Sequence, residues 1–241
     1  MRSVWITRTQ PEPPGPLIPA LQAAGWSVTP LPVLGIEALP LTSAEEQQLL
    51  EQIDKADHIL WTSAHAVTAV APFWPERPPQ AQLHAVGERT AQVVAETLGL
   101  RCLAPPEGQG GQAWVEGMQG RWQAGQHLLL LTGVGGQQDW AAEARQAGLR
   151  VQLRRVYRRL PRVCALPPGL PEAVIGSSGE ALAALSAILP ADRREALQQR
   201  PLILAAERLL ERARSLGWSG RMQALPALSP AAVLAALEEH R

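Results

Sequence analysis

Two stretches of this chain share one plan, and that plan limits the folds that the chain can adopt. HILWTSAHAVTAV at 58–70 and EAVIGSSGEALAAL at 172–185 each pass from a buried apolar run, through two small hydroxyl residues, into a helical pattern. Uniformly apolar runs that alternate with helices are typical of parallel strands covered on both faces. The sequence therefore predicts an α/β fold with parallel sheets. The six expected strands are 3–7, 58–62, 83–87, 127–132, 172–176 and 201–205.

The order of these units repeats along the chain, which indicates an internal duplication. The strand–helix–strand unit at the start corresponds to 128–151, and the stretch at 58 corresponds to the one at 172. The strand and helix at 83–99 correspond to those at 202–217, and a closing helix follows in each half. Four matches in the same order lead us to interpret the chain as two copies of one α/β unit.

Proline-rich segments suggest where the copies are divided. PRVCALPPGLP at 161–171 cannot be regular helix or central strand, because proline fixes φ and removes an amide donor. TPLPVLGIEALP at 29–40 is a second extended, proline-punctuated segment. Two crossings predict that the chain builds one domain, leaves it, completes another and returns.

Composition argues against several classes of function. The 22 basic residues balance 22 acidic ones, so neither nucleic acid nor an acidic membrane is expected as the main partner. The two cysteines form no CxxC, no histidine lies at ligand spacing, and no metal site is expected. No run approaches the ~20 apolar residues of a membrane span, and no signal peptide is recognised, so we expect a cytoplasmic protein. We expect the scattered histidines at the surface or at helix caps, namely His58, His65, His84, His127 and His240.

Small polar residues follow the expected strands, where ligands of parallel α/β sheets bind. Each of them can simply cap the following helix, or its hydroxyl and the free amides can bind an anion. For any one residue both explanations stay open, but the whole set favours a large polyanionic ligand without a cofactor. The candidate binding residues are Thr7, Thr62, Ser63, Gly87, Thr132, Gly133, Ser177 and Ser178.

Two further motifs bear on the chemistry. Gly133-x-Gly135 is a partial dinucleotide fingerprint without a third glycine or an acidic partner, so NAD binding is rejected. The only tyrosine, Tyr157, lies in LRRVYRRLPR at 153–162. Either this is an extended segment whose arginines face water, or the phenol donates a proton while the guanidiniums hold carboxylates. The sequence leaves both alternatives open.

Several short motifs, in their order along the chain, resemble those of the uroporphyrinogen-III synthase family. They are ITR at 6–8, TSAHAV at 62–67, AVGERTA at 85–91, AGL followed by VY within 147–157, and GSSGEAL at 176–182. Together they extend over nearly the whole chain. The resemblance implies two flavodoxin-like domains joined by a two-stranded linker, each presenting a hydroxyl turn to a shared cleft.

The boundaries implied are 1–35 plus 168–241 for the first domain and 36–165 for the second, with linkers near 32–40 and 160–170. The implied reaction cyclises the linear tetrapyrrole hydroxymethylbilane to uroporphyrinogen III, with ring D inverted and water lost. Ring A would lose its hydroxyl to give an azafulvene, and ring D would attack to form a spiro intermediate. No metal or organic cofactor is implied, and the family implies a monomer. A transient contact with the upstream deaminase is left open.

The resemblance also assigns roles to residues. Tyr157 matches the tyrosine that is the family's usual candidate proton donor. Two departures, His65 in place of asparagine and AAERLL at 205–210, leave open an intracellular two-lobed binding or regulatory homologue without turnover. The residues that match substrate-contacting positions are Thr7, Arg8, Ser63, Thr90 and Ser178.

Overall fold

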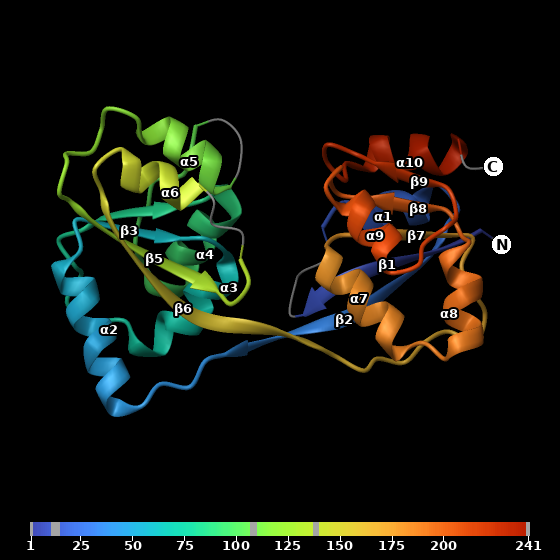
Figure 1. Ribbon diagram of the computed structural model, residues 1–241, viewed down its shortest axis with the longest axis horizontal. Coiled ribbons are helices and arrows are strands. Elements are labelled where there is room, and N and C mark those ends of the chain that lie inside the picture. Colours follow the sequence, from blue (N-terminus) through green and yellow to red (C-terminus); the bar gives the residue numbers. More distant parts are fainter. Residues whose placement is uncertain (1, 11–14, 107–109, 137–139, 240–241) are drawn as a thin grey trace. The chain divides into compact units, whose positions relative to one another are not determined.

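A computed structural model describes residues 2–10, 15–106, 110–136 and 140–239 (Figure 1). The chain divides into two compact units. Unit 1 consists of Met1–Ile36 and Leu160–Arg241, and unit 2 consists of Glu37–Arg159. Within the described ranges, no helix has the length and apolar character needed to cross a membrane.

Unit 1 is built on a parallel sheet with the strand order β2-β1-β7-β8-β9. The strands expected near 3, 172 and 201 are confirmed: β7 and β8 are buried throughout, and β1 is buried from Val4 to Thr7. One strand was not predicted, because β9 has three residues, all only half-buried. The strands are β1 (Ser3–Gln10), β2 (Ser27–Ala38), β7 (Ala173–Gly176), β8 (Leu202–Leu204) and β9 (Met222–Ala224).

Helices cover both faces of the unit 1 sheet. Trp5 points to the face that packs against α7, α8 and α9, while its neighbours Val4 and Ile6 point to α1 and α10. This alternation is the period of two that a strand imposes on its side chains. The helices are α1 (Leu17–Ala23), α7 (Gly179–Ile188), α8 (Ala191–Gln198), α9 (Leu209–Ser215) and α10 (Pro230–Glu239).

Unit 2 contains a second run of parallel strands in the order β4-β3-β5-β6. An isolated parallel bridge between His84 and Leu103 extends its edge. The strands expected at 58, 83 and 127 are confirmed, and all four residues of β3 are buried. The strands are β3 (His58–Trp61), β4 (Gln82–Ala85), β5 (His127–Gly133) and β6 (Arg150–Pro161).

The unit 2 sheet is also covered on both faces. Helices α5 and α6 pack on the face formed by Leu60, Leu128 and Leu130, while α2, α3 and α4 lie on the opposite side of the sheet (Figure 1). The mixed α/β class with a mostly parallel sheet is therefore confirmed. The helices are α2 (Ser43–Lys55), α3 (Ala64–Val70), a short 3₁₀ turn (Ala71–Phe73), α4 (Glu88–Leu98), α5 (Gly111–Met118) and α6 (Trp140–Gln146).

Candidate functional site

The phenol of Tyr157 lies at the centre of a polar cluster in unit 2. Its side chain is 2% exposed. The phenolic oxygen is 3.0 Å from Oγ of Ser63 and accepts a hydrogen bond of 3.2 Å from Nη2 of Arg159. The Arg159 guanidinium also lies 5.5 Å from the centre of the phenol ring, and the ring of His65 meets it edge-on at 5.8 Å. A hydroxyl and a guanidinium thus hold the phenolic oxygen in place.

Local backbone structure brings these side chains together. Ser63 has extended backbone angles and caps α3, because its Oγ accepts the N–H of Ala66 at 3.2 Å. Across the sheet, a register shift after Thr132 pairs Gly133 with Tyr157. A Cβ atom at Gly133 would lie 2.5 Å from Cζ of the phenol ring. The position therefore requires glycine, since any side chain would displace the ring.

Pairs of hydroxyl residues join neighbouring strand ends in both units. In unit 2, Oγ1 of Thr62 donates to Oγ1 of Thr132 at 2.9 Å. In unit 1, the amide of Ser177 donates to Oγ1 of Thr7 at 3.2 Å, and Oγ of Ser177 donates to the carbonyl of Thr7 at 3.1 Å. Ser178 then caps α7 by accepting the N–H of Ala181. Capping, the simpler of the two explanations, therefore accounts for both serine turns in part.

The other predicted site residues lie at separate strand ends. Gly87 precedes α4 and Thr90 lies in its first turn, where the threonine is 6% exposed. Arg8 is half-buried on β1. The structure thus brings Thr62, Ser63, Thr132, Gly133 and Tyr157 together in unit 2, and Thr7, Ser177 and Ser178 together in unit 1.

The arginines beside Tyr157 have different partners. Arg158 makes two hydrogen bonds to the carboxylate of Glu37, at 3.2 and 2.9 Å, and these bonds raise the pKa of Arg158 further above its ordinary value. Arg154 donates to the side chain of Gln48 on α2. Arg159 alone among these three lies on the phenol. The segment is an extended strand, as the first alternative expects, and the role of the phenol as a proton donor stays a prediction.

The expectation for the histidines was wrong for two of them. His58 and His84 are 2% and 1% exposed, and Nδ1 of His58 lies 3.2 Å from Nε2 of His84. They face each other because β3 and β4 are neighbours in parallel register, with Leu60 opposite His84. Burial, with a smaller effect from His58, lowers the pKa of His84 to about 4. Their place inside apolar runs was the signal that sequence reasoning missed. His240 lies outside the described residues.

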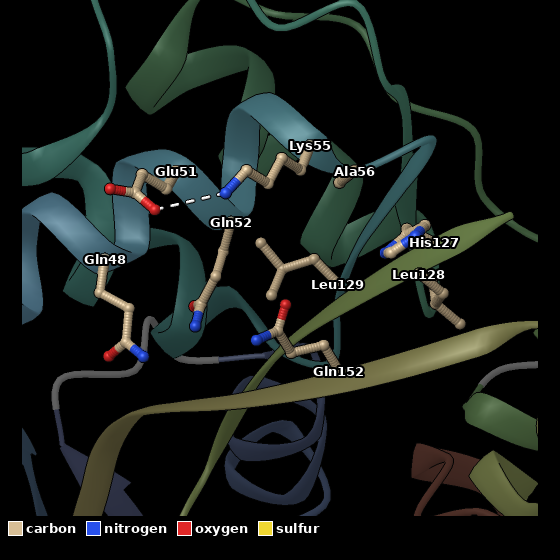
Figure 2. Close-up of a pocket in the computed structure, with 9 residues that line it drawn as sticks. All are labelled: Gln48, Glu51, Gln52, Lys55, Ala56, His127, Leu128, Leu129 and Gln152. Atoms are coloured by element: carbon tan, nitrogen blue, oxygen red, sulfur yellow. Dashed lines mark hydrogen bonds and ion pairs between the residues drawn. The ribbon is translucent and has the colours of Figure 1, made fainter.

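A hollow of about 230 Å³ lies between α2 and the strands β5 and β6 (Figure 2). Gln52 and Gln152 both extend into it, and at its rim Glu51 and Lys55 form an ion pair of 3.4 Å between exposed side chains. None of the predicted site residues lines this hollow. In the part of the chain that the structure describes, no three His, Cys, Asp or Glu side chains are grouped to hold a metal ion.

Comparison with known families decides the relationship of this chain. A family model described as uroporphyrinogen-III synthase HemD matches residues 16–227. The chain belongs to the uroporphyrinogen-III synthase family. The resemblance inferred from its short ordered motifs is thereby confirmed.

Solved structures of uroporphyrinogen-III synthases have the same fold. The enzyme from Helicobacter pylori 26695 aligns over 100% of both chains with a TM-score of 0.66 and 13% identity. A mutant of the enzyme from the extremely thermophilic bacterium Thermus thermophilus aligns over 99% of this chain and 100% of its own, with a TM-score of 0.56 and 17% identity. At such low identity the fold is shared while the side chains differ, so the Tyr157 cluster has to be judged on its own geometry.

Proposed function

We propose that this chain is a cyclising lyase of tetrapyrrole biosynthesis that converts hydroxymethylbilane into uroporphyrinogen III, inverting ring D and releasing water. The observation that carries this conclusion is the family match over residues 16–227. The alternative of a binding or regulatory homologue without turnover is not favoured by that match. The proposed reaction requires neither a metal nor an organic cofactor.

We propose Tyr157 as the proton donor to the departing hydroxyl of ring A. The phenolic oxygen already accepts a hydrogen bond from Arg159, and a guanidinium beside it would offset the negative charge left after the proton is given up. Charge-assisted hydrogen bonds of this kind are stronger than neutral ones. The hydroxyl of ring A would leave as water once it is protonated.

Burial of Tyr157 makes Ser63 part of this proposal. The phenol is 2% exposed, whereas Ser63 is half-buried and its Oγ lies 3.0 Å from the phenolic oxygen. We propose that Ser63 orients the phenol toward the substrate and, by keeping its second hydrogen bond to the amide of Ala66, remains fixed itself. Positioning of this kind matters because the unassisted bilane closes without inverting ring D.

The remaining predicted residues are proposed as contacts for the substrate's carboxylates. Backbone amides at the turns of Ser63 and Ser178 and the guanidinium of Arg8 are groups that bind carboxylate oxygens. Thr7, Thr62, Thr132 and Ser177 would fix these turns through the hydroxyl pairs described above. Gly87 and Thr90 would contribute at the end of the neighbouring strand β4.

We further propose that the two units are duplicated flavodoxin-like domains. In unit 1 the order β2-β1-β7-β8-β9 reads 2-1-3-4-5 along its own segments, which is the flavodoxin-like order. In unit 2 the spatial order is β6-β5-β3-β4, followed by the bridge at Leu103. These five positions correspond to the five positions in unit 1, but the chain passes through them in a different order, starting at β3. A monomeric, cytoplasmic enzyme is the form expected from the family, and contact with the upstream deaminase stays a prediction.

Replacing Tyr157 with phenylalanine tests the proton donor. The change keeps the ring and removes only the hydroxyl, and general acids contribute about 10²- to 10⁴-fold to rate. We expect the rate of uroporphyrinogen III formation to fall by about 10²-fold or more. Arg158→Gln is the matched control, because Arg158 neighbours Tyr157 on β6 but pairs with Glu37, and its rate should stay near that of the unmodified protein. An unchanged rate in Tyr157→Phe would exclude the phenol as donor.

A further inference from the structure

The hydrogen bonds to the Tyr157 oxygen do not fix the plane of its ring. Oγ of Ser63 and Nη2 of Arg159 lie 3.0 and 3.2 Å from that oxygen. The oxygen lies on the axis about which a phenol ring rotates, so these two contacts fix its position and leave the ring free to turn. The torsion about this axis, χ2, has only a broad preference of its own. Other groups therefore have to set the plane of the ring.

The plane of the ring matters because it determines where the phenolic hydrogen points. The oxygen of a phenol shares a lone pair with the ring, and this conjugation keeps the O–H bond in the ring plane. The step rests on the proposed function, in which Tyr157 donates a proton. Proton transfer depends on alignment as well as on distance. A turned ring would therefore aim the proton away from the leaving group even while the oxygen stays in place.

Three residues lie against the body of the ring. Gly133 approaches through its backbone, since a Cβ atom there would be 2.5 Å from Cζ of the phenol. The guanidinium of Arg159 lies 5.5 Å from the ring centre. The imidazole of His65 has its centre 5.8 Å from that of the phenol, with the two ring planes 65° apart. Aromatic pairs favour such an edge-to-face arrangement, and its energy depends on the angle between the planes.

His65 is held in a fixed place relative to the phenol. It lies in the first turn of α3 and is half-buried. The same turn begins at Ser63, whose Oγ caps the helix through the amide of Ala66 and also contacts the Tyr157 oxygen. One hydroxyl thus ties the start of α3 to the tip of the phenol, and the imidazole carried by that turn meets the body of the ring.

We infer that His65 is a positioning residue that sets the plane of the Tyr157 ring and thereby the direction in which the phenol offers its proton. Ser63 and Arg159 fix the position of the oxygen, and His65 fixes the rotation of the ring behind it. The inference gives a role to one of the two departures from the family motifs, the histidine at position 65.

Crystal structures of the unmodified protein and of two variants measure the ring plane directly. His65→Ala removes the imidazole, whereas His65→Phe keeps an aromatic ring without its nitrogens. In His65→Ala the phenol ring should turn or occupy several orientations, while its oxygen stays within hydrogen-bonding distance of Ser63. In His65→Phe the two rings should keep an edge-to-face arrangement close to the 65° between planes in the unmodified protein.

The rate of uroporphyrinogen III formation gives a second measurement. Since the substrate still binds while the proton is misdirected, His65→Ala should lower kcat about tenfold and leave KM within about twofold of its value. His65→Phe should restore most of the lost rate. Thr68→Ala is the matched control, because Thr68 is exposed on the same helix and its hydroxyl donates to the carbonyl of Ala64. Its kcat should equal that of the unmodified protein.

A double-mutant cycle shows whether His65 acts through the phenol. In a Tyr157→Phe background, His65→Ala should cost no further rate, because there is no hydroxyl left to direct. The inference is overturned if the ring keeps its plane in His65→Ala, if His65→Phe loses as much rate as His65→Ala, or if the losses from His65→Ala and Tyr157→Phe are additive. Isomer I alone from the unmodified protein would instead contradict the proposed function, and the crystal structures would still decide whether His65 holds the ring.

Discussion

Adding a single methyl group at Gly133 should displace the phenol on which the proposed chemistry depends. A Cβ atom at this position would lie 2.5 Å from Cζ, 2.8 Å from Cε2 and 2.9 Å from the hydroxyl oxygen of Tyr157. Because carbon atoms pack at about 3.5 to 4.0 Å, the ring would have to retreat by roughly 1 Å. A shift of that size breaks or lengthens the hydrogen bonds to Ser63 and Arg159, which are 3.0 and 3.2 Å long.

The expected magnitudes follow from this displacement. Overpacking of a buried site costs about 1–3 kcal/mol, so Gly133→Ala should lower the free energy of unfolding by that amount in urea titration. A misplacement of about 1 Å can reduce catalysis by roughly 10²-fold, and we expect a loss of this order in the rate of uroporphyrinogen III formation. Gly35→Ala on β2 is the control, since its Cβ would meet only a carbonyl oxygen at 4.0 Å.

A double-mutant cycle separates displacement of the phenol from general damage. If Gly133→Ala acts through the Tyr157 hydroxyl, the same substitution in a Tyr157→Phe background should cost little further rate, because the hydroxyl is already absent. Fully additive losses of rate would show that the methyl group acts elsewhere. A Gly133→Ala variant with normal stability and normal rate would refute the close approach of ring and backbone altogether.

Three further predictions concern His84, the serine caps and helix α5. As pH falls from 6.5 to about 4, His84 is protonated in the unfolded chain before it is protonated in the folded chain, so this residue should reduce the free energy of unfolding by roughly 3 kcal/mol. Urea titrations at the two pH values measure this loss. In a His84→Asn variant the free energy of unfolding should depend less on pH. Ser63→Ala and Ser178→Ala should each reduce the free energy of unfolding by about 1 kcal/mol, because each removes a helix cap. Only Ser63→Ala should also strongly reduce the rate of catalysis, because only Ser63 contacts the phenol. Equal rates in the two variants would remove Ser63 from the proposed mechanism. In α5, Gly111→Ala should destabilise the protein because its Cβ would overlap a buried indole, whereas Gly117→Ala should stabilise the protein by up to about 1 kcal/mol. Thermal unfolding distinguishes the two variants, and equal shifts of the melting temperature would contradict the reasoning.

Much of the fold could be predicted because the central strands are buried on both faces. HILW at β3 and AVIG at β7 are fully buried, and such uniformly apolar runs are the signal that a parallel sheet leaves in a sequence. Edge elements leave a weaker signal. Met222–Ala224 forms β9 with three half-buried residues, and Leu103 contributes only a single bridge, so neither could be recognised from a pattern of burial.

The contacts among the candidate site residues could not be predicted from the sequence. Ser63 and Tyr157 are 94 positions apart, and the hydrogen bond between them depends on the order β3-β5-β6, which no local pattern specifies. Gly133 was expected to contact the substrate. In the structure, its lack of a side chain also leaves room for the phenol ring of Tyr157. The prediction that His58 and His84 lie at the surface or at helix caps was wrong, because it rested on the polarity of histidine and not on the apolar runs that surround both residues.

Product isomer analysis tests the central claim most directly. The purified protein is supplied with hydroxymethylbilane made in place by the upstream deaminase, the products are oxidised, and the porphyrin isomers are separated by chromatography. We expect mainly isomer III, since ring D inversion is the step that the family's enzymes add to spontaneous closure. Isomer I alone, as in a reaction without the protein, would contradict the proposed function.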